Sequence, residues 1–126
     1  MLYKYKNDYE KIAIGLLSFI PDLKEISHLK SCFEWYRAED DRHLYLWKNE
    51  DGDFIAIAGI EVDDASKLLM LRHISVTPAE RNHGVCFKVM DALSKLYPDY
   101  ELMGSLETAG LLSKWENQNG VADGNK

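Results

Sequence analysis

The segment RHISVTPAERNHGV, residues 72–85, holds residue types that could bind a phosphate group. It joins a strand-like stretch to a proline and a charged turn with one glycine, and the amphipathic stretch CFKVMDALSKL follows directly. If a helix begins near Gly84, its first backbone N–H groups lack partners within the helix, and with the helix dipole they attract an anion. Arg81 could add a charge-assisted hydrogen bond to a phosphate oxygen. The alternative is an ordinary connection between a strand and a helix.

Two well-known phosphate-binding loops do not match this segment. It has no Gly-Lys-Ser/Thr triplet, which excludes the loop of the nucleotide triphosphatases. It has no G-x-G-x-x-G pattern, which excludes the dinucleotide-binding fingerprint.

The elements that must position this segment follow from the hydrophobic periodicity. Apolar alternation or continuous apolar runs predict strands over residues 2–6, 43–47, 54–62, 68–76 and 101–106. Apolar residues at helical spacing predict helices over residues 8–20, 22–36, 84–97 and 111–117. The resulting order, β-α-α-β-β-β-α-β-α, predicts an α/β sheet with helices on its faces.

Two local features refine this prediction. Asp22, with Glu25 three residues later, is typical of a capping box that opens the second helix. Gly59 lies inside a predicted strand, which indicates a bulge or a close approach of another group to the backbone.

The pattern V-x-P-x-x-R-x-x-G-x-(small residue), from Val76 to Cys86, resembles the acetyl-CoA pyrophosphate loop of the GNAT N-acetyltransferases. Arg81, Gly84 and Cys86 occupy the three defining positions, with Cys86 in place of the usual Gly or Ala. More narrowly, KIAIGLLSFIP, DRHLYLWKNEDG and RHISVTPAER together resemble the small GNAT protein encoded in bacterial riboflavin operons. The resemblance implies a GNAT-type α/β fold with a mixed, mainly antiparallel sheet and a truncated C-terminus.

The resemblance also implies acetyl-CoA as co-substrate, and direct transfer of its acetyl group to an amine, from a small molecule or a protein. In the family, the strand before the loop separates from its neighbour, and the pantetheine arm lies between the two. Backbone groups around Ile74 and Val76 would pair with the pantetheine, and the amides from His83 to Phe87 would hold the pyrophosphate. The implied cofactor-binding residues are Ile74, Val76, Arg81, Asn82, His83, Gly84, Val85, Cys86 and Phe87.

The positions of the family's usual proton-transfer residues are not filled in this chain. Matching by position places Leu112 where a Tyr acid is common, and Leu cannot donate a proton. It places Met70 and Arg72 at the positions of the common base on the strand. Neither is a plausible base, because Met does not titrate usefully and Arg stays protonated.

The protein would then use a water or a carboxylate from elsewhere as the base, or transfer slowly, or not transfer at all. Glu61 is the candidate base because it is the nearest carboxylate by sequence, with Glu34 and Glu107 behind it. Arg72 is the second candidate catalytic residue. It could orient a carboxylate or phosphate of the acceptor, or it could form a salt bridge with Glu61 or another acid. Strand alternation places His73 on the opposite face from Arg72, which predicts a packed or hydrogen-bonded histidine.

The cysteines and the remaining histidines predict neither a disulfide nor a metal site. Cys32 and Cys86 lie far apart in the sequence, and His28 and His43 have no metal-like company, so we expect no metal. The first turn of a helix would lower the pKa of the Cys86 thiol, whereas a bound pyrophosphate would oppose that effect. The small size of cysteine is explanation enough for its place in the loop.

Composition sets the broad class. The chain of 126 residues fits a single domain, which we place at residues 1–118, followed by a polar tail at 119–126. A net charge of -6 argues against a broad nucleic-acid surface. No apolar run approaches the roughly 20 residues that span a bilayer. Two thiols and charges throughout the first dozen residues, unlike a secretory signal, favour a cytoplasmic protein.

The unfilled acid and base positions leave alternatives open. One is a CoA-binding sensor or partner subunit that has lost catalysis. Another is a structural domain whose strand–helix turn imitates the loop. A shortened sheet edge makes a homodimer plausible.

Overall fold

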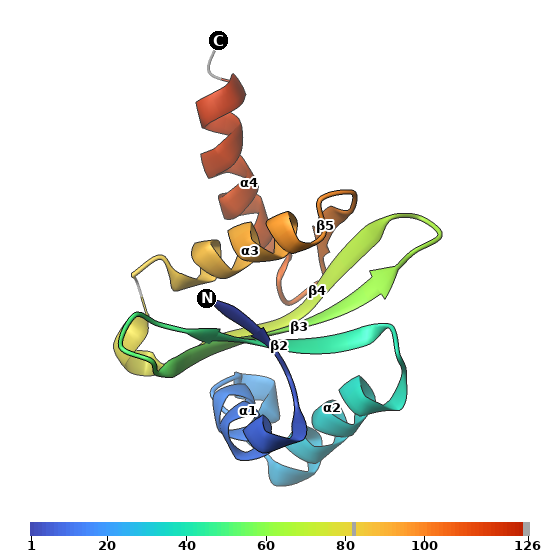
Figure 1. Cartoon of the computed structure of the whole chain (residues 1–126), viewed down its shortest axis with the longest axis vertical. Coiled ribbons are helices and arrows are strands. Elements are labelled where there is room, and N and C mark those ends of the chain that lie inside the picture. The colour runs from blue at the N-terminus through green and yellow to red at the C-terminus, as the bar shows by residue number, and fades with distance from the viewer. Residues whose placement is uncertain (82, 125–126) are drawn as a thin grey trace.

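The computed structural model describes residues 1–81 and 83–124, and its elements follow the predicted order (Figure 1). The strands within these residues are β1 (Leu2–Lys4), β2 (Arg42–Lys48), β3 (Phe54–Asp63), β4 (Leu68–Val76) and β5 (Glu101–Gly104). The α-helices are α1 (Glu10–Leu17), α2 (Ile26–Ala38), α3 (Val85–Leu96) and α4 (Ala109–Gly124). Short 3₁₀ turns precede α1, α2 and α3, at η1 (Asn7–Tyr9), η2 (Pro21–Leu23) and η3 (Pro78–Glu80).

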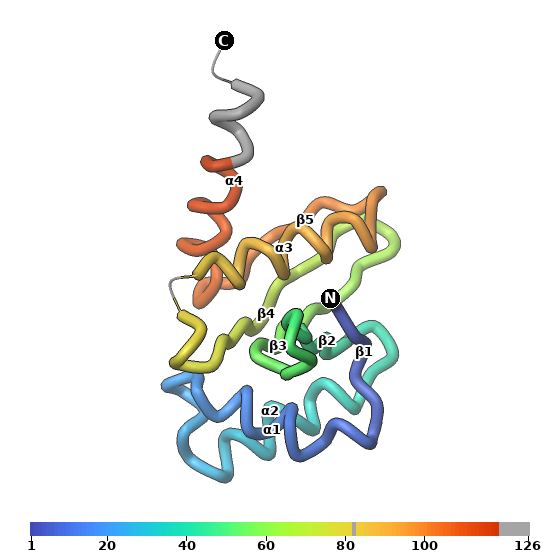
Figure 2. The backbone as a smooth tube through the Cα atoms, turned by 60° about the vertical axis from the view of Figure 1, so that its left-hand side comes forward, coloured from blue at the N-terminus to red at the C-terminus, as the bar shows by residue number. Residues whose placement is uncertain are grey.

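The strands form one mixed sheet in the order β1-β2-β3-β4-β5. The pairings from β1 to β4 are antiparallel, and β4 pairs with β5 in parallel. Helices α1 and α2 cover one face, and α3 with the start of α4 packs on the other (Figures 1 and 2). The predicted α/β architecture, with a mainly antiparallel sheet between helices, is confirmed.

Two hydrophobic cores lie on the two faces of this sheet, because successive side chains of a strand point to opposite sides. Leu44 and Leu46 on β2 face α1 and α2. Tyr45, between them, belongs to the core under α3. The central strands are therefore apolar along most of their length.

The parallel pairing of β4 with β5 is short, and it ends at Leu71 and Gly104. After this point the chain turns away: the Ser105 N–H donates to the Leu71 carbonyl at 3.3 Å, and the Thr108 hydroxyl donates to the same carbonyl at 2.7 Å. Residues 72–76 of β4 continue beyond the pairing, with no described strand on that side. The separation of the two strands, which the family resemblance implied, is present.

Gly59 shows both features that its position in a strand predicted. The pairing of β3 with β4 shifts register between Gly59 and Ile60, which makes Arg72 the extra residue on β4. A Cβ at position 59 would lie 2.8 Å from Cε1 of Tyr36 and would overlap its hydroxyl group. Glycine is required here because the Tyr36 side chain lies against the backbone.

The predicted capping box is wrong. Asp22 lies within the turn η2, which begins at Pro21, and α2 begins only at Ile26. Glu25 is the N-cap residue, and its side chain makes no capping hydrogen bond. Pro21 at the first position of a 3₁₀ turn explains the difference, because its fixed φ favours helix-like turns that begin at this residue.

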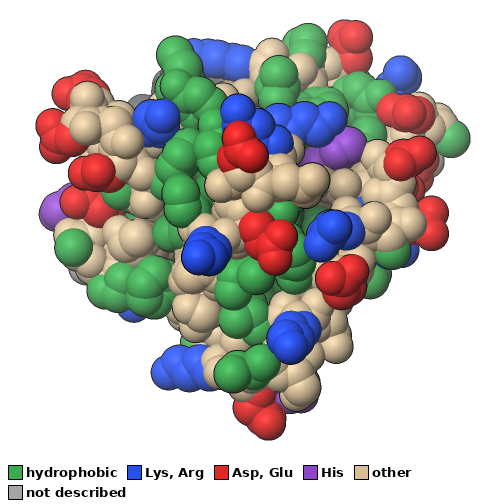
Figure 3. Space-filling view, turned by 60° about the horizontal axis from the view of Figure 1, so that its bottom comes forward, with side chains coloured by type: hydrophobic (Ala, Val, Ile, Leu, Met, Phe, Trp, Pro, Cys, Tyr) green, Lys and Arg blue, Asp and Glu red, His purple; other side chains and the backbone are tan. Residues whose placement is uncertain are grey.

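Helix α4 continues to Gly124, so the backbone of residues 119–124 in the predicted tail is helical, whereas residues 125–126 lie outside the described part. Among the described residues, no helix is long and apolar enough to span a membrane. On the face that α1 and α2 bring forward, acidic and basic side chains are interspersed among hydrophobic ones (Figure 3).

Candidate functional site

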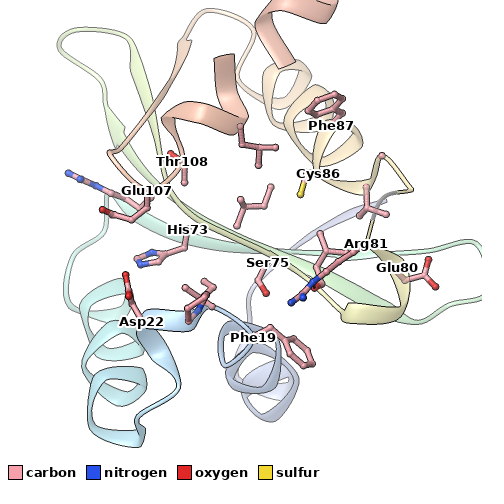
Figure 4. Close-up of a pocket in the computed structure, with 18 residues that line it drawn as sticks. Phe19, Asp22, His73, Ser75, Glu80, Arg81, Cys86, Phe87, Glu107 and Thr108 are labelled. Carbon is pink, nitrogen blue, oxygen red and sulfur yellow. The ribbon is translucent and has the colours of Figure 1, made fainter. Parts of the chain in front are cut away.

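A cavity of about 810 Å³ lies where β4 separates from β5 (Figure 4). Its walls come from residues 19–22, 72–76, 80–81, 84–87, 107–108 and 111. These residues belong to the turn before α2, to β4, to the loop and first turn of α3, and to the start of α4. The volume is within the range of roughly 300–1,000 Å³ that is typical of small-molecule sites.

The first turn of α3 forms one end of the cavity. Gly84 is the N-cap residue and has a left-handed backbone with φ of 75°, a conformation that glycine adopts without strain. The first helical hydrogen bond runs from the Lys88 N–H to the Gly84 carbonyl at 3.1 Å. The amides of Val85, Cys86 and Phe87 precede that bond, so they have no helical acceptor. This arrangement can hold an anion, as the sequence predicts.

Arg81 and its neighbours occupy the loop between β4 and α3. Arg81 lines the cavity, and its Nε donates to the Val76 carbonyl at 3.2 Å (Figure 4). His83 is exposed, with Nδ1 at 3.9 Å from a Glu80 carboxylate oxygen. Asn82, a predicted cofactor contact, lies outside the described residues.

The backbone of β4 beyond Leu71 faces the cavity at alternate residues. The Thr77 N–H donates to the Ile55 carbonyl on β3 at 2.9 Å, so Thr77 faces β3. Because the direction alternates along an antiparallel strand, the backbone groups of Val76 and Ile74 face the opening. Both residues therefore present backbone groups to the cavity, although the Val76 carbonyl already accepts a bond from Arg81. Their pairing with a pantetheine arm stays a prediction.

The side chains at the start of α3 pack into the core under this helix. Val85 is buried, and Cys86 and Phe87 are half-buried against the same core. Burial raises the pKa of the Cys86 thiol, which is opposite to the effect of a helix N-terminus alone. The thiol is protonated at neutral pH, and its role is to fill space beside the loop.

Glu61 and Arg72 form an ion pair. Nη2 and Nε of Arg72 donate to the same Glu61 oxygen, Oε1, at 2.8 and 3.0 Å. The salt-bridge alternative for Arg72 is therefore what the structure shows. Glu61 lines a separate cavity of about 480 Å³, and Arg72 lies between this cavity and the larger one because it lines both.

The other two predicted carboxylates lie in different places. Glu34 is exposed on α2 and lies 3.7 Å from Arg37. Glu107 lines the larger cavity. A role for Glu61 as the base stays a prediction, and its carboxylate already binds Arg72.

His73 is hydrogen-bonded, as predicted, but it also lines the larger cavity. Its Nδ1 lies 2.5 Å from the Tyr36 hydroxyl, and its Nε2 lies 3.8 Å from the Cys32 sulfur. Strand alternation alone separates His73 from Arg72, yet both line the same cavity. The extra residue at the register shift interrupts the alternation. Gly59 already indicated a bulge in the sequence, and a bulge there could have predicted that His73 lines the cavity.

Leu112, at the position matched to the family's Tyr acid, does not line the cavity. Leu112 is 4% exposed and belongs to the core under α3. Among the described residues, no group of three or more His, Cys, Asp or Glu side chains could hold a metal ion.

Comparisons with known proteins agree with this geometry. The family model described as "Acetyltransferase (GNAT) family" matches residues 9–110. An uncharacterised N-acetyltransferase of Bacillus methanolicus, encoded in the lysA 3′ region, is 40% identical over 116 residues, which cover 92% of this chain and 95% of that protein.

Solved structures share the fold at low sequence identity. The structure of AAC(6′)-Iy in complex with the bisubstrate analogue CoA-S-monomethyl-acetylneamine has a TM-score of 0.70 at 16% identity, with 94% of this chain and 87% of that chain covered. Mutant forms of the spermidine/spermine N-acetyltransferase of Vibrio cholerae have a TM-score of 0.68 at 8% identity, with 93% and 76% covered. The match to the family model over most of the chain and the relative from Bacillus methanolicus establish that this chain belongs to the acetyltransferase (GNAT) family.

Proposed function

We propose that this protein binds acetyl-CoA in the larger cavity and transfers the acetyl group to an amine. The observation that carries the proposal is the continuity of one cavity from the open edge of β4 to the first turn of α3. The open edge offers backbone groups to an extended pantetheine arm. The amides after Gly84 and the nearby Arg81 offer hydrogen bonds to a pyrophosphate. The neighbour AAC(6′)-Iy, in complex with a CoA-linked bisubstrate analogue, supports this proposal through its fold.

The acceptor that fits the cavity best is a small amine with more than one positive charge. Asp22 and Glu107 line the end of the cavity away from Cys86, on either side of His73 (Figure 4). Two carboxylates near the acceptor would attract such a cation. Neighbours named as aminoglycoside 6′-N-acetyltransferases and a spermidine/spermine N-acetyltransferase support an acceptor of this class.

Three narrower proposals concern the pathway, the cellular compartment and the oligomeric state of the protein. The narrower resemblance to RibT, the GNAT protein of bacterial riboflavin operons, suggests a link to riboflavin biosynthesis. The cysteine content suggests a cytoplasmic setting. The unpaired outer edge of β5 within the described sheet suggests a homodimer, which would cover it.

A second candidate function is a CoA-binding sensor without catalysis. Two observations favour it: Leu112 is buried where an acid is common, and the Glu61 carboxylate is held by Arg72. Both functions require the same cofactor cavity, so the amine-dependent release of free CoA thiol distinguishes them.

The first experiment is a calorimetric titration of acetyl-CoA into the wild-type protein and into Gly84→Ala and Gly84→Glu. We expect wild-type binding in the micromolar range, about -8 kcal/mol. A Cβ at position 84 meets no atom within 4 Å, so Ala introduces only backbone strain and should weaken binding several-fold. Glu adds a negative charge beside the pyrophosphate and should abolish binding. Equal affinity of Gly84→Glu and wild type would place the cofactor elsewhere, and no binding to the wild type would remove the proposal.

A further inference from the structure

His73 is the side chain in the larger cavity that is best suited to accept a proton near neutral pH. It lies on β4 at the point where the strand leaves its pairing with β5, and it is half-buried. Figure 4 shows its ring between Asp22 and Glu107, away from the end of the cavity that Cys86 marks. A cofactor with its pyrophosphate at Gly84 and its pantetheine along β4 would bring the thioester toward this end.

Two side chains of α2 hold the imidazole from behind. The Tyr36 hydroxyl lies 2.5 Å from Nδ1, and the Cys32 sulfur lies 3.8 Å from Nε2. The Tyr36 ring is fixed in turn, because it lies against the backbone of Gly59 in the space that a Cβ would occupy. A histidine whose one nitrogen is engaged by a buried partner has a defined ring orientation, as general bases require.

We propose that His73 is the general base of the transfer: its Nε2 accepts a proton from the acceptor ammonium, and Tyr36 is a positioning residue that accepts the Nδ1–H. This inference rests on the proposed acetyl transfer. In this tautomer Nε2 keeps its lone pair, and the Cys32 thiol is its weak neighbour. Burial raises the pKa of Cys32 to about 11, so the thiol stays protonated and can donate only a weak S–H bond to Nε2, which an ammonium, as the stronger donor, displaces.

The chemical step balances with this one base. The ammonium gives one proton to Nε2, and the neutral amine attacks the thioester carbonyl carbon. A C–N bond forms, the C–S bond breaks, and the CoA sulfur leaves as a thiolate that takes the second proton of the attacking nitrogen. The imidazolium then releases its proton to water. The products are the acetylated amine, CoA thiol and one proton.

The charged and titratable groups around His73 set its protonation. Tyr36 and Cys32 face it from α2, Asp22 from η2, and Glu107 from the segment before α4. Arg72 is its neighbour on β4. Burial lowers the pKa of His73 below its usual value, against the opposing effects of Glu107 and Asp22. The imidazole is therefore neutral, and able to accept a proton, at pH 7.

Glu61 is the competing base that the sequence names first. Its carboxylate accepts two N–H bonds from Arg72 and lines the smaller cavity. To act, it would have to release Arg72 and reach into the larger cavity, whereas His73 already lines it.

The test compares His73→Asn with Tyr36→Phe, with Glu61→Gln, and with His28→Asn as the matched control. His28 is a suitable control because its side chain is 61% exposed and does not line the cavity. Thiol release from acetyl-CoA is measured with spermidine as acceptor between about pH 5.5 and 9.

We expect kcat/KM for spermidine to fall by about 10²-fold or more in His73→Asn, with loss of the acid limb of the pH profile. Tyr36→Phe should lower kcat several-fold and leave KM for acetyl-CoA unchanged, whereas Glu61→Gln should keep the acid limb and His28→Asn should keep the whole wild-type profile.

A second measurement decides the matter if spermidine is not turned over. Two-dimensional ¹⁵N NMR of the four imidazoles, with and without acetyl-CoA, reports which nitrogen of His73 carries the proton. An unprotonated Nε2 whose signal shifts on addition of acetyl-CoA supports the inference, and a protonated Nε2 in the neutral ring overturns it. A His73→Asn variant with the wild-type profile also overturns it.

Calorimetry on the same samples separates this inference from the proposed function. If wild type does not bind acetyl-CoA, the proposed function fails. If wild type binds it and His73→Asn binds and turns over equally well, only the role of His73 fails.

Discussion

Replacing Gly59 by alanine should destabilise the protein through its contact with Tyr36. Gly59 has no left-handed backbone, so alanine is allowed at this position and the cost comes from the contact alone. The new Cβ would lie 2.8 Å from Cε1 of Tyr36 and overlap its hydroxyl, so the buried ring must move. Forcing extra volume into a packed core costs about 1–3 kcal/mol. Breaking the bond between the buried hydroxyl and His73 adds about 1–3 kcal/mol.

We therefore expect Gly59→Ala to lower the free energy of unfolding by about 2–5 kcal/mol, a large share of the roughly 5–15 kcal/mol typical of a domain. Urea unfolding followed by circular dichroism measures it. Tyr36→Leu is the matched partner, because leucine keeps an apolar core residue but lacks the three atoms that the new Cβ would meet. In that background, Gly59→Ala should no longer destabilise the protein and should gain about 0.5–1 kcal/mol, since alanine is inherently better than glycine in a strand. The coupling energy of the double-mutant cycle, which is the difference between these two effects, should then be about 2–6 kcal/mol. Strictly additive effects would refute the claim that Tyr36 packs against this backbone.

Two further predictions concern charge and pH. Glu61→Gln should leave the affinity for acetyl-CoA nearly intact. If Glu61 were the base, as its place in the sequence predicts, this substitution would sharply lower the rate of thiol release. An unchanged rate would exclude that role. Burial lowers the folded-state pKa of His73 and of His43 below 6.5, so the folded protein resists their protonation. The stability from their neutral forms is complete above about pH 6.5 and is lost as the pH falls below it. Urea unfolding at about pH 7.5 and 5.5 should therefore show a larger loss for wild type than for His73→Asn, and an equal loss would contradict the burial of this imidazole.

The sequence by itself determined the architecture, and it predicted the loop at one end of the candidate site. Hydrophobic periodicity predicted the order of elements, because strand and helix periods depend on local geometry that a single segment carries. The strand β4 was predicted with its observed ends, Leu68 and Val76. The loop from Arg81 to Gly84 was recognisable for the same reason: a left-handed glycine before a helix is a local requirement, met by residues adjacent in the chain.

Tertiary structure decided the chemistry at the other end of the cavity. From the sequence, a salt bridge between Glu61 and Arg72 was only one of two alternatives, because the pairing depends on the register between β3 and β4. The same register shifts at Gly59, which brings His73 into the cavity and against Tyr36 of a different element. A change of one residue in strand register reverses the face of every following side chain. The side chains that meet at this end were therefore fixed by the packing of α2 against the sheet, beyond what strand alternation could predict.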